Sequence, residues 1–374
     1  MANFPTVGVI GCGSYGLTRA LDYNRRTQQL IKVYAAANHR RIFDKARRQP
    51  DIEATEAMIG RYHADFEENL GKLCDFAEYI LVSVPSNAHD DIVERHKPYR
   101  EKLRGSKLVF TSGNGIAPIA HRALNPANTF ESSRASYTCR AEELETGEVK
   151  CRMNGFKVRM VLASYLKADS TSIDALQHIF GMPVELYHDL LQLLMVNNHG
   201  VVHPPSLLRG RFAIERRAKM FTYRDLMGAP FVTMEILAAD AQLKKLAEAL
   251  GVEKRETVLE TLNRDYGTEY PDLQTLVQDF QPLNKRPVLP SSMNSRMITQ
   301  DIGILAVLYV SLGRALGVDM SVFEAWIKEA SWINQTDYWK TGRTLKAYGL
   351  SETASREDIW KAFKCYEEKK KKTS

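Results

Sequence analysis

Short apolar runs alternate with polar, helix-compatible stretches from Thr6 to about Leu166. Continuous runs rich in β-branched residues are typical of strands buried on both faces, and their alternation with helices is typical of a parallel sheet. The pattern therefore predicts an α/β fold with a parallel sheet in this half of the chain. The runs are Val7–Ile10, Ile31–Ala37, Tyr79–Val84, Leu108–Phe110 and Val158–Ala163.

The apolar residues follow a helical period from about Ser172 onward. Leucines recur at helical spacing over Leu186–Val196, and the amphipathic stretch Phe231–Leu250 is followed by Gly251, a residue that commonly ends helices. Residues Ile302–Val318 are apolar on nearly all sides, which is typical of a helix in the middle of a bundle. The second half is therefore predicted to be all-helical.

The length of 374 residues fits about two domains, since one domain takes roughly 150 residues. Gly181 and Pro183 interrupt the pattern between the two halves. We therefore expect an α/β domain over residues 1–180 and an all-helical domain over residues 181–374.

The composition is that of a globular protein, with 44% hydrophobic and 26% charged residues. The net charge of +6 comes partly from the run Lys369–Lys372, and no nucleic-acid-binding motif is present, so we expect no nucleic-acid partner. The longest apolar run, Ile302–Leu312, is shorter than the ~20 residues that cross a bilayer, so we expect no membrane association. Five cysteines without a CxxC pair, and no signal-peptide pattern at the N-terminus, favour a cytoplasmic location.

The first predicted strand leads directly into a GxGxxG motif. In such a motif the first glycine allows a tight turn, the second lets the backbone approach a pyrophosphate, and the third lets the following helix lie close to the strand. The helix N-terminus adds partial positive charge for the phosphates. This context predicts a Rossmann-type, doubly wound domain that binds a dinucleotide, although methyltransferases also have a glycine-rich first loop. The motif consists of Gly11, Cys12, Gly13, Ser14, Tyr15 and Gly16.

The end of the second strand indicates which dinucleotide is bound. An acidic residue there would bind the ribose hydroxyls of NAD, whereas this chain has Asn38, Arg40 and Arg41. Arginines can neutralise the 2′-phosphate of NADP, so NADP is favoured and NAD stays possible; the alternative is that both arginines only begin a solvated helix. Pro85 and Ser86 follow a later strand and are expected to face the cofactor or to form an ordinary turn.

The helical half contains three candidates for chemistry. His203 can act as a general acid or base if a carboxylate orients it, and Asp301 and Arg296 flank the apolar helix, where charges need partners. The structural alternatives are a core histidine, a helix cap and a surface ion-pair residue. His199 lies four residues before His203, but no third ligand is near in the sequence, so we expect no metal.

At these positions the chain resembles the opine dehydrogenase family, of the octopine and nopaline type, over essentially its whole length. The residues that carry the resemblance, besides the glycine motif, are Val84–Ser86, Glu131, Tyr137, Arg140, His203, Pro204, Arg296, Asp301, Gly313–Val318, Asp337, Tyr338, Gly342–Leu345, Gly349 and Leu350.

The resemblance implies a Rossmann domain, an all-helical domain and an active site between them. It implies that NAD(P)H drives the reductive condensation of an α-keto acid with the amino group of an amino acid or another amine, which gives a secondary amine. By position, His203 matches the catalytic histidine, Asp301 its carboxylate partner, and Arg296 the residue that grips the keto acid carboxylate. We also expect a homodimer.

The chain departs from the family pattern beside these residues. His199 stands where the family often has asparagine, and the family's Glu-Asp-Val-Pro is replaced by Gln300, Asp301, Ile302 and Gly303. These changes leave open an amine donor outside the usual amino acids.

Two rival functions remain open at this point. A β-hydroxyacid or ketopantoate-type dehydrogenase shares the two-domain plan but relies on a catalytic lysine, and Leu186–Leu208 contains no lysine. A non-catalytic NADP-sensing protein would have no need of His203, Arg296 and Asp301 together.

Overall fold

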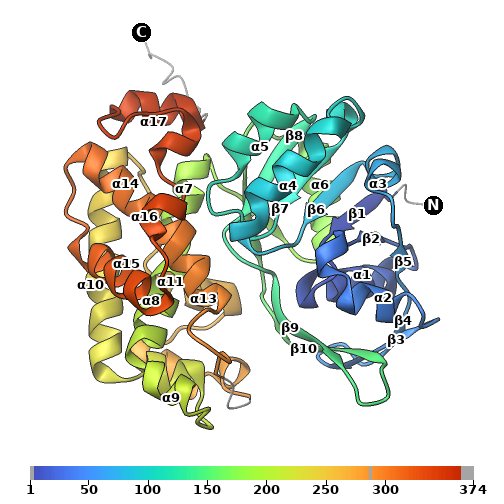
Figure 1. The fold of residues 1–374 in the computed structure, drawn as a ribbon, viewed down its shortest axis with the longest axis horizontal. Coiled ribbons are helices and arrows are strands. Elements are labelled where there is room, and N and C mark those ends of the chain that lie inside the picture. Colours follow the sequence, from blue (N-terminus) through green and yellow to red (C-terminus); the bar gives the residue numbers. More distant parts are fainter. Residues whose placement is uncertain (1–3, 286–288, 364–374) are drawn as a thin grey trace.

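The structure, a computed structural model, describes residues 4–285 and 289–363. A sheet domain built from the first half of the chain lies beside a helical domain built from the second half (Figure 1). The basic run Lys369–Lys372 and Cys365, which entered the sequence analysis, lie outside the described residues.

The sheet domain confirms the predicted parallel α/β fold. Its eight strands have the order β12-β11-β8-β7-β6-β1-β2-β5, and only the β11–β8 pair is antiparallel. Each of the five predicted runs overlaps a strand, and β1 lies between β2 and β6. The strands are β1 (Val7–Ile10), β2 (Lys32–Tyr34), β5 (Asp65–Phe66), β6 (Tyr79–Val82), β7 (Lys107–Phe110), β8 (Asn128–Ser132), β11 (Met160–Ser164) and β12 (Val184–Leu186).

Helices cover both faces of this sheet, as a doubly wound fold requires. Val9 and Leu81 pack into one core cluster, with α1 and α6, whereas Ile10 and Ile80 pack into another, with α3, α4 and α5. This alternation explains why the strands are apolar on both sides. The helices are α1 (Ser14–Thr27), α2 (Arg41–Ala46), α3 (Leu70–Phe76), α4 (His89–His96), α5 (Ala117–Leu124) and α6 (Ser170–Phe180).

A second, four-stranded sheet was not predicted. Val149, Cys151 and Met153 are buried and alternate with partly exposed Lys150 and Arg152, which is the pattern of a strand with one covered face. This sheet packs against α1, and its β9–β10 ribbon runs along one side of the sheet domain (Figure 1). Its strand order is β4 (Gly60–Tyr62), β3 (Ile52–Glu56), β10 (Val149–Phe156) and β9 (Tyr137–Glu143).

The second half is helical after β12, as predicted. Leu186 ends that strand and does not begin a helix, so the sheet continues past the expected boundary between residues 180 and 181. The helices are α7 (Leu190–Met195), α8 (His199–Arg209), α9 (Arg211–Glu215), α10 (Pro230–Leu250), α11 (Val258–Tyr266), α12 (Leu273–Asp279), α13 (Arg296–Thr299), α14 (Val307–Leu316), α15 (Ser321–Asn334), α16 (Tyr338–Thr341) and α17 (Arg356–Phe363), with π-helical segments η5 (Thr222–Met227) and η7 (Asp301–Ala306).

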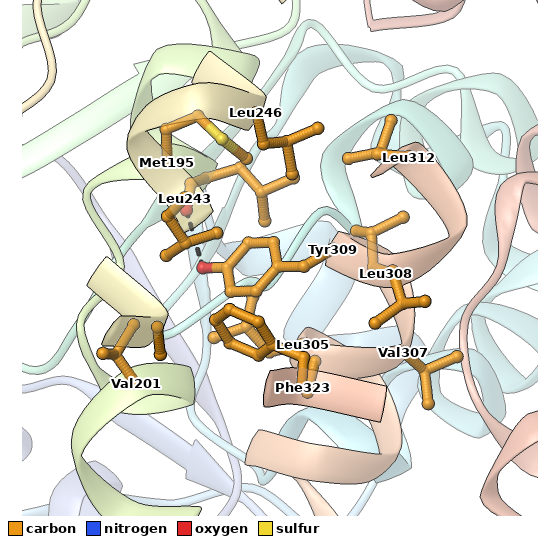
Figure 2. Packing of buried hydrophobic residues seen from close by; sticks show 14 of the residues in the cluster. Met195, Val201, Leu243, Leu246, Leu305, Val307, Leu308, Tyr309, Leu312 and Phe323 are labelled. Carbon is orange, nitrogen blue, oxygen red and sulfur yellow. Dashed lines mark hydrogen bonds between the residues drawn. The ribbon is translucent and has the colours of Figure 1, made fainter. Parts of the chain in front are cut away.

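The core of the helical domain surrounds α14, as its uniformly apolar sequence predicts. Tyr309 is fully buried there, and its hydroxyl donates a hydrogen bond to the carbonyl of Leu194 at 2.8 Å (Figure 2). Leu243 and Phe323 of neighbouring helices pack around the same ring. Arg296–Leu316 is long and apolar enough to cross a membrane by length and composition, but 83% of its apolar window is buried inside the protein, as in a core helix.

Candidate active site

The glycine motif forms the turn between β1 and α1. Gly11 has φ +108°, a backbone conformation that side chains other than glycine rarely adopt. A Cβ on Gly16 would lie 1.9 Å from the Gly11 carbonyl oxygen, so the third glycine is required for the helix to approach the turn. A Cβ on Gly13 would meet nothing within 4 Å. The second glycine is therefore not needed for protein packing, and it leaves open space where a pyrophosphate would approach.

The side chains of Ser14 and Tyr15 contact the second sheet. The Ser14 Oγ accepts a hydrogen bond from the Ala141 N–H at 3.0 Å, and the Tyr15 hydroxyl lies 2.9 Å from the Ser136 Oγ. These two predicted cofactor residues thereby fix the start of α1 to β9 and to the segment before it. Any contact that they make with a phosphate would come from the backbone N–H groups at the helix N-terminus.

The residues predicted to select NADP lie after β2, but their charges are partly neutralised. Asn38 is exposed in a short 3₁₀ turn. Arg40 pairs with Asp44 at 3.0 Å and also with Glu68, and Arg41, which is 78% exposed, lies 3.2 Å from an oxygen of Glu143. Glu68 lies shortly before α3 and Glu143 ends β9, so these carboxylates come from other segments of the chain than the arginines.

The loop after β6 connects the sheet to the helical domain. Pro85 precedes Ser86, whose N–H donates to the Gln300 Oε1 at 3.0 Å. The Ser86 Oγ accepts from the Asn114 Nδ2 at 2.9 Å, and the Asn197 Nδ2 donates to the Asn114 Oδ1 at 2.7 Å. This loop therefore lies against the helical domain and is not an ordinary surface turn.

His203 and Asp301 meet, although they are far apart in the sequence. The His203 Nδ1 lies 2.7 Å from the Asp301 Oδ2, and both side chains are buried. The Gln300 Nε2 donates to the other oxygen of Asp301 at 3.1 Å. When Nδ1 donates to the carboxylate, Nε2 carries the free lone pair, and this atom is buried with no partner among the described residues. The arrangement is that of a general base oriented by a carboxylate.

Local helix geometry gives Asp301 this position. Asp301 is the first residue of the π-helical segment Asp301–Ala306. Its side chain does not cap this segment, so the alternative role of a helix cap is not realised. Short π-helical segments are frequent at functional sites because the extra residue in the turn redirects side chains. On the other side of the pair, His203 lies in the middle of α8, next to Pro204.

His199 lies one helical turn before His203. The two imidazole rings stack with centroids 5.0 Å apart and an interplanar angle of 17°. Burial lowers the pKa of His199 well below its usual value, and the electrostatic effect of the neighbouring His203, Lys157 and Arg296 lowers it further. Its Nδ1 is buried and unpartnered within the described part of the chain. No group of three His, Cys, Asp or Glu side chains suited to a metal occurs among the described residues.

Arg296 begins α13 and is exposed. No acidic side chain in residues 4–285 or 289–363 pairs with it, so the structural alternative of an ion-pair residue is not realised there. It lies close enough to His199 to act on that ring electrostatically. The guanidinium is therefore free to bind a carboxylate next to the two histidines.

The sequence did not predict the contacts of three residues in this region, of which only Gln300 had been noted, as a departure from the family pattern. Gln300 and Asn114 connect the loop at Ser86 to the rest of the site. Their hydrogen bonds to Ser86 join segments that are remote in the sequence. Lys157 follows β10 and acts electrostatically on His199, and it lies outside Leu186–Leu208, the segment in which the rival enzymes would have their lysine.

The chain is similar to known proteins over nearly its whole length. Residues 186–334 match the family described as NAD/NADP octopine/nopaline dehydrogenase, alpha-helical domain. The chain is 26% identical over 355 residues to vitopine synthase of Allorhizobium ampelinum, which covers 92% of this chain and 95% of that protein.

Two solved structures share the fold. Octopine dehydrogenase with NADH and L-arginine superposes with a TM-score of 0.74 at 14% identity and covers 95% of this chain and 97% of that one. Yersinopine dehydrogenase with bound NADP⁺ gives a TM-score of 0.69 at 15% identity, over 98% and 100% of the two chains. The helical half thus matches the octopine/nopaline dehydrogenase family, and nearly the full length of the chain is similar to opine synthases and dehydrogenases.

Proposed function

We propose that this protein is an NAD(P)H-dependent opine dehydrogenase, which condenses an α-keto acid with the amino group of an amino acid or another amine and reduces the product to a secondary amine. The observation that carries the proposal is the buried His203–Asp301 pair with an unpartnered Nε2, close to a free arginine. Solved relatives bound to NADH with L-arginine or with pyruvate support the same substrate classes.

The residues of the site divide the work between binding and proton transfer. Arg296 binds the keto acid carboxylate through two parallel N–H donors. The His203 Nε2 takes a proton from the ammonium group of the donor, which frees the nitrogen to attack the keto carbon. A second proton passes from nitrogen to the keto oxygen to give the carbinolamine, and the protonated His203 then protonates its hydroxyl group, which leaves as water. Asp301 holds the imidazole orientation and stabilises its protonated form, which these two transfers require. The resulting imine is the species to be reduced.

The glycine turn fits the phosphates of a nicotinamide dinucleotide. Gly13 offers open space, and the N-terminus of α1 directs its free N–H groups toward it. Bound NAD(P)H supplies the hydride for the imine carbon. The Ser86 loop and Gln300 connect this end of the sheet to Asp301, so the dyad is positioned relative to the cofactor by hydrogen bonds.

We propose NADPH as the preferred cofactor. Asn38, Arg40 and Arg41 support it because they stand where an acidic residue would bind the ribose hydroxyls of NAD. A phosphate with about −1.5 to −2 charge competes well against the single carboxylates that now pair with the arginines. Replacing both arginines by Ala should lower kcat/KM for NADPH about tenfold or more, and leave that for NADH nearly unchanged. Equal use of both cofactors by the wild-type protein would contradict the preference.

We also propose a homodimer in the cytoplasm. The side chains of Phe231, Met234 and Leu237 are 80%, 63% and 53% exposed along α10, and contact with a second copy would cover this apolar face. Light scattering should give the mass of a dimer, and Phe231→Asp should give a monomer. The free cysteines at positions 12, 74, 139 and 151 support a reducing compartment, which cell fractionation tests.

The function is tested by NADPH oxidation with a panel of keto acids, first alone and then with a panel of amines. Turnover that requires an amine, with the condensed product identified by mass spectrometry, is the expected result. Turnover with a keto acid alone would instead support a hydroxyacid or ketopantoate-type dehydrogenase. NADPH binding without any turnover would support the sensing protein.

A further inference from the structure

Gln300 connects the dyad of His203 and Asp301 to the loop after β6. Its Oε1 accepts a hydrogen bond from the Ser86 N–H at 3.0 Å, and its Nε2 donates to the Asp301 Oδ1 at 3.1 Å. Because a backbone N–H can only donate, it fixes the oxygen of the amide on the Ser86 side and the nitrogen on the Asp301 side. Gln300 and Asp301 are both buried. The side chain of Gln300 therefore presents an N–H, and not an oxygen, to the carboxylate.

The polar chain behind Gln300 contains no group that titrates near neutral pH. The Ser86 Oγ accepts from the Asn114 Nδ2 at 2.9 Å, and the Asn114 Oδ1 accepts from the Asn197 Nδ2 at 2.7 Å. Amides and a serine hydroxyl neither gain nor lose a proton there. Among the described residues, the imidazole that binds Oδ2 is therefore the one partner of the Asp301 carboxylate that can exchange a proton with it.

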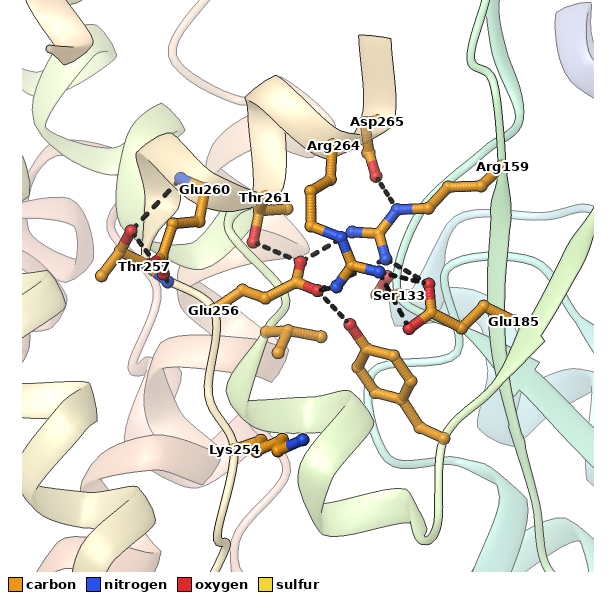
Figure 3. A network of polar contacts seen from close by, with 12 residues as sticks. Ser133, Arg159, Glu185, Lys254, Glu256, Thr257, Glu260, Thr261, Arg264 and Asp265 are labelled. Carbon is orange, nitrogen blue, oxygen red and sulfur yellow. Dashed lines mark hydrogen bonds and ion pairs between the residues drawn. The ribbon is translucent and has the colours of Figure 1, made fainter. Parts of the chain in front are cut away.

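Another polar network across the domain boundary is ionic. Figure 3 shows Arg159 and Arg264 between the carboxylates of Glu185 and Glu256. Arg159 of the sheet domain lies 2.6 Å from Glu256 of the helical domain, and it also reaches Asp265 of α11. These ion pairs join the two domains independently of the amide chain. A change in the amide chain is therefore expected to leave the domains attached.

The other titratable and charged groups around the dyad keep their charge near pH about 6.5, where a histidine usually titrates. Burial lowers the pKa of the second histidine well below its usual value and raises the pKa of the tyrosines, so these groups are neutral. Burial also lowers the pKa of Lys157, to about 8, so the lysine and the two arginines are positive. The groups are His199 of α8, Tyr223 of η5, Arg296 of α13, Tyr309 of α14, Tyr338 of α16, and Lys157 and Arg134 of the sheet domain.

We propose that Gln300 is a positioning residue for the dyad, whose amide N–H weakens the hold of Asp301 on the proton of His203 and thereby allows the imidazolium to release it. This inference rests on the proposed function, in which His203 first takes up a proton and later gives it to the leaving hydroxyl group. The positive end of the amide dipole faces the carboxylate, and the hydrogen bond disperses the negative charge of the carboxylate. Without the amide, Asp301 would bind the imidazolium more tightly, and the ring would be a weaker acid.

The test removes the amide and keeps the size of the side chain. Gln300→Met should move the midpoint of the His203 ring titration to higher pH by about one unit, because the carboxylate then has no donor besides the ring. NMR of the protein with ¹³C-labelled histidine follows this titration, and His203→Ala identifies the signal. The acid limb of kcat/KM should move in the same direction, and kcat should fall about threefold to tenfold. The KM of the keto acid and the affinity for NADPH should stay near the wild type.

Gln242 of α10 provides a matched control because its side chain makes the same kinds of contact. Its Nε2 donates to the Asp319 Oδ2 at 3.2 Å, and its Oε1 accepts from the Val322 N–H at 3.2 Å. These contacts join α10 to the start of α15 and do not involve the dyad. Gln242→Met should therefore leave the ring titration and the kinetics as in the wild type.

Gln300→Glu is the second variant, because its carboxylate still accepts from the Ser86 N–H. It replaces the amide N–H beside Asp301 with a negative charge, so the midpoint should again move to higher pH, by about one unit or more. A folded variant whose His203 ring titrates as in the wild type would overturn the role of Gln300 while leaving the proposed function intact. Absence of turnover with every amine would refute the proposed function, whereas the ring titration, which needs no substrate, would still decide whether Gln300 acts on the dyad.

Discussion

At the scale of single residues, the two stacked histidines of α8 are in opposite electrostatic surroundings. Asp301 accepts from the His203 Nδ1, so the protonated form of that ring has a matched charge beside it. His199 has cations around it, and burial together with these charges keeps its pKa well below the usual value. One ring is therefore suited to carry a proton, and the other stays neutral and is suited to hydrogen bonding.

Replacement of either member of the dyad should impair turnover strongly. We expect His203→Ala to lower kcat by about 10²- to 10⁴-fold, the usual contribution of a positioned acid or base. Asp301→Asn should also lower kcat, and the double variant should be little worse than the poorer single variant, since the two act as one unit. NADPH affinity, followed by fluorescence titration, should stay near wild type in all three. Effects that simply multiply would show that the two residues act independently.

Arg296 should be sensitive even to a conservative change. Lysine keeps the positive charge but loses the planar pair of donors that matches a carboxylate. We expect Arg296→Lys to raise the KM of the keto acid roughly tenfold or more, with little change in NADPH binding. Arg314→Lys, on the exposed side of α14 and paired with Glu324, is the control. A parallel loss of keto acid and NADPH affinity would assign Arg296 a role in holding the fold.

At the scale of elements, the glycines of the β1–α1 turn have different roles: Gly11 and Gly16 are needed for the local backbone, whereas Gly13 leaves space for a ligand. We expect Gly13→Ala to leave the melting temperature nearly unchanged, because its Cβ meets no protein atom within 4 Å, while the affinity for NADPH falls markedly. Gly16→Ala should instead destabilise the protein by about 1–3 kcal/mol, because its Cβ would collide with the Gly11 carbonyl. Thermal melting and NADPH titration of both variants distinguish these outcomes. If Gly13→Ala binds NADPH normally, the pyrophosphate does not approach this turn.

The elements predicted from the sequence are those whose pattern is complete within one segment. The doubly buried strands and the amphipathic helix Pro230–Leu250 are examples. The second sheet was missed because its strands are short or partly exposed, and β10 pairs with β3 from far earlier in the chain. The same limit applies to the site. His203 and Asp301 were candidates from the sequence and received their roles from the resemblance. Lys157, and the hydrogen bond from the Ser86 loop to Gln300, enter only through tertiary packing, which periodicity does not report.

At the scale of the whole molecule, the site depends on how the two domains contact each other. Hydrogen bonds run from the Ser86 loop of the sheet domain through Gln300 to Asp301 and His203. Farther along the same boundary, sheet-domain cations bind Asp265 of the helical domain. The first connection positions the dyad, and the second holds α11 against the sheet domain. Stability of the boundary and geometry of the site are therefore linked.

We expect the attachment of the helical domain to the sheet domain to weaken at low pH, because it depends on the charge of Asp265. Burial alone would raise the pKa of Asp265, but Arg134 and Lys157 outweigh it and hold that pKa well below its usual range. A carboxyl group with a lowered pKa stabilises the folded state at every pH above the unfolded value of about 3.9, and this contribution is lost as the pH falls below that value. Asp265→Asn removes the charge at all pH values.

We therefore expect Asp265→Asn to lower the free energy of unfolding by about 3–5 kcal/mol at pH 7, because it leaves buried cations unpaired. The gap to the wild type should shrink by about 1.4 kcal/mol per pH unit below pH 4, because the carboxyl group then becomes protonated in the unfolded wild-type chain while it stays ionised in the folded protein. Urea unfolding followed by tryptophan fluorescence measures this directly, since all 4 tryptophans lie in the helical domain. Asp75→Asn, which breaks an exposed pair with Lys102, should change the free energy by less than about 1 kcal/mol. A gap that stays constant from pH 7 to pH 3 would show that Asp265 contributes through packing and not through its charge.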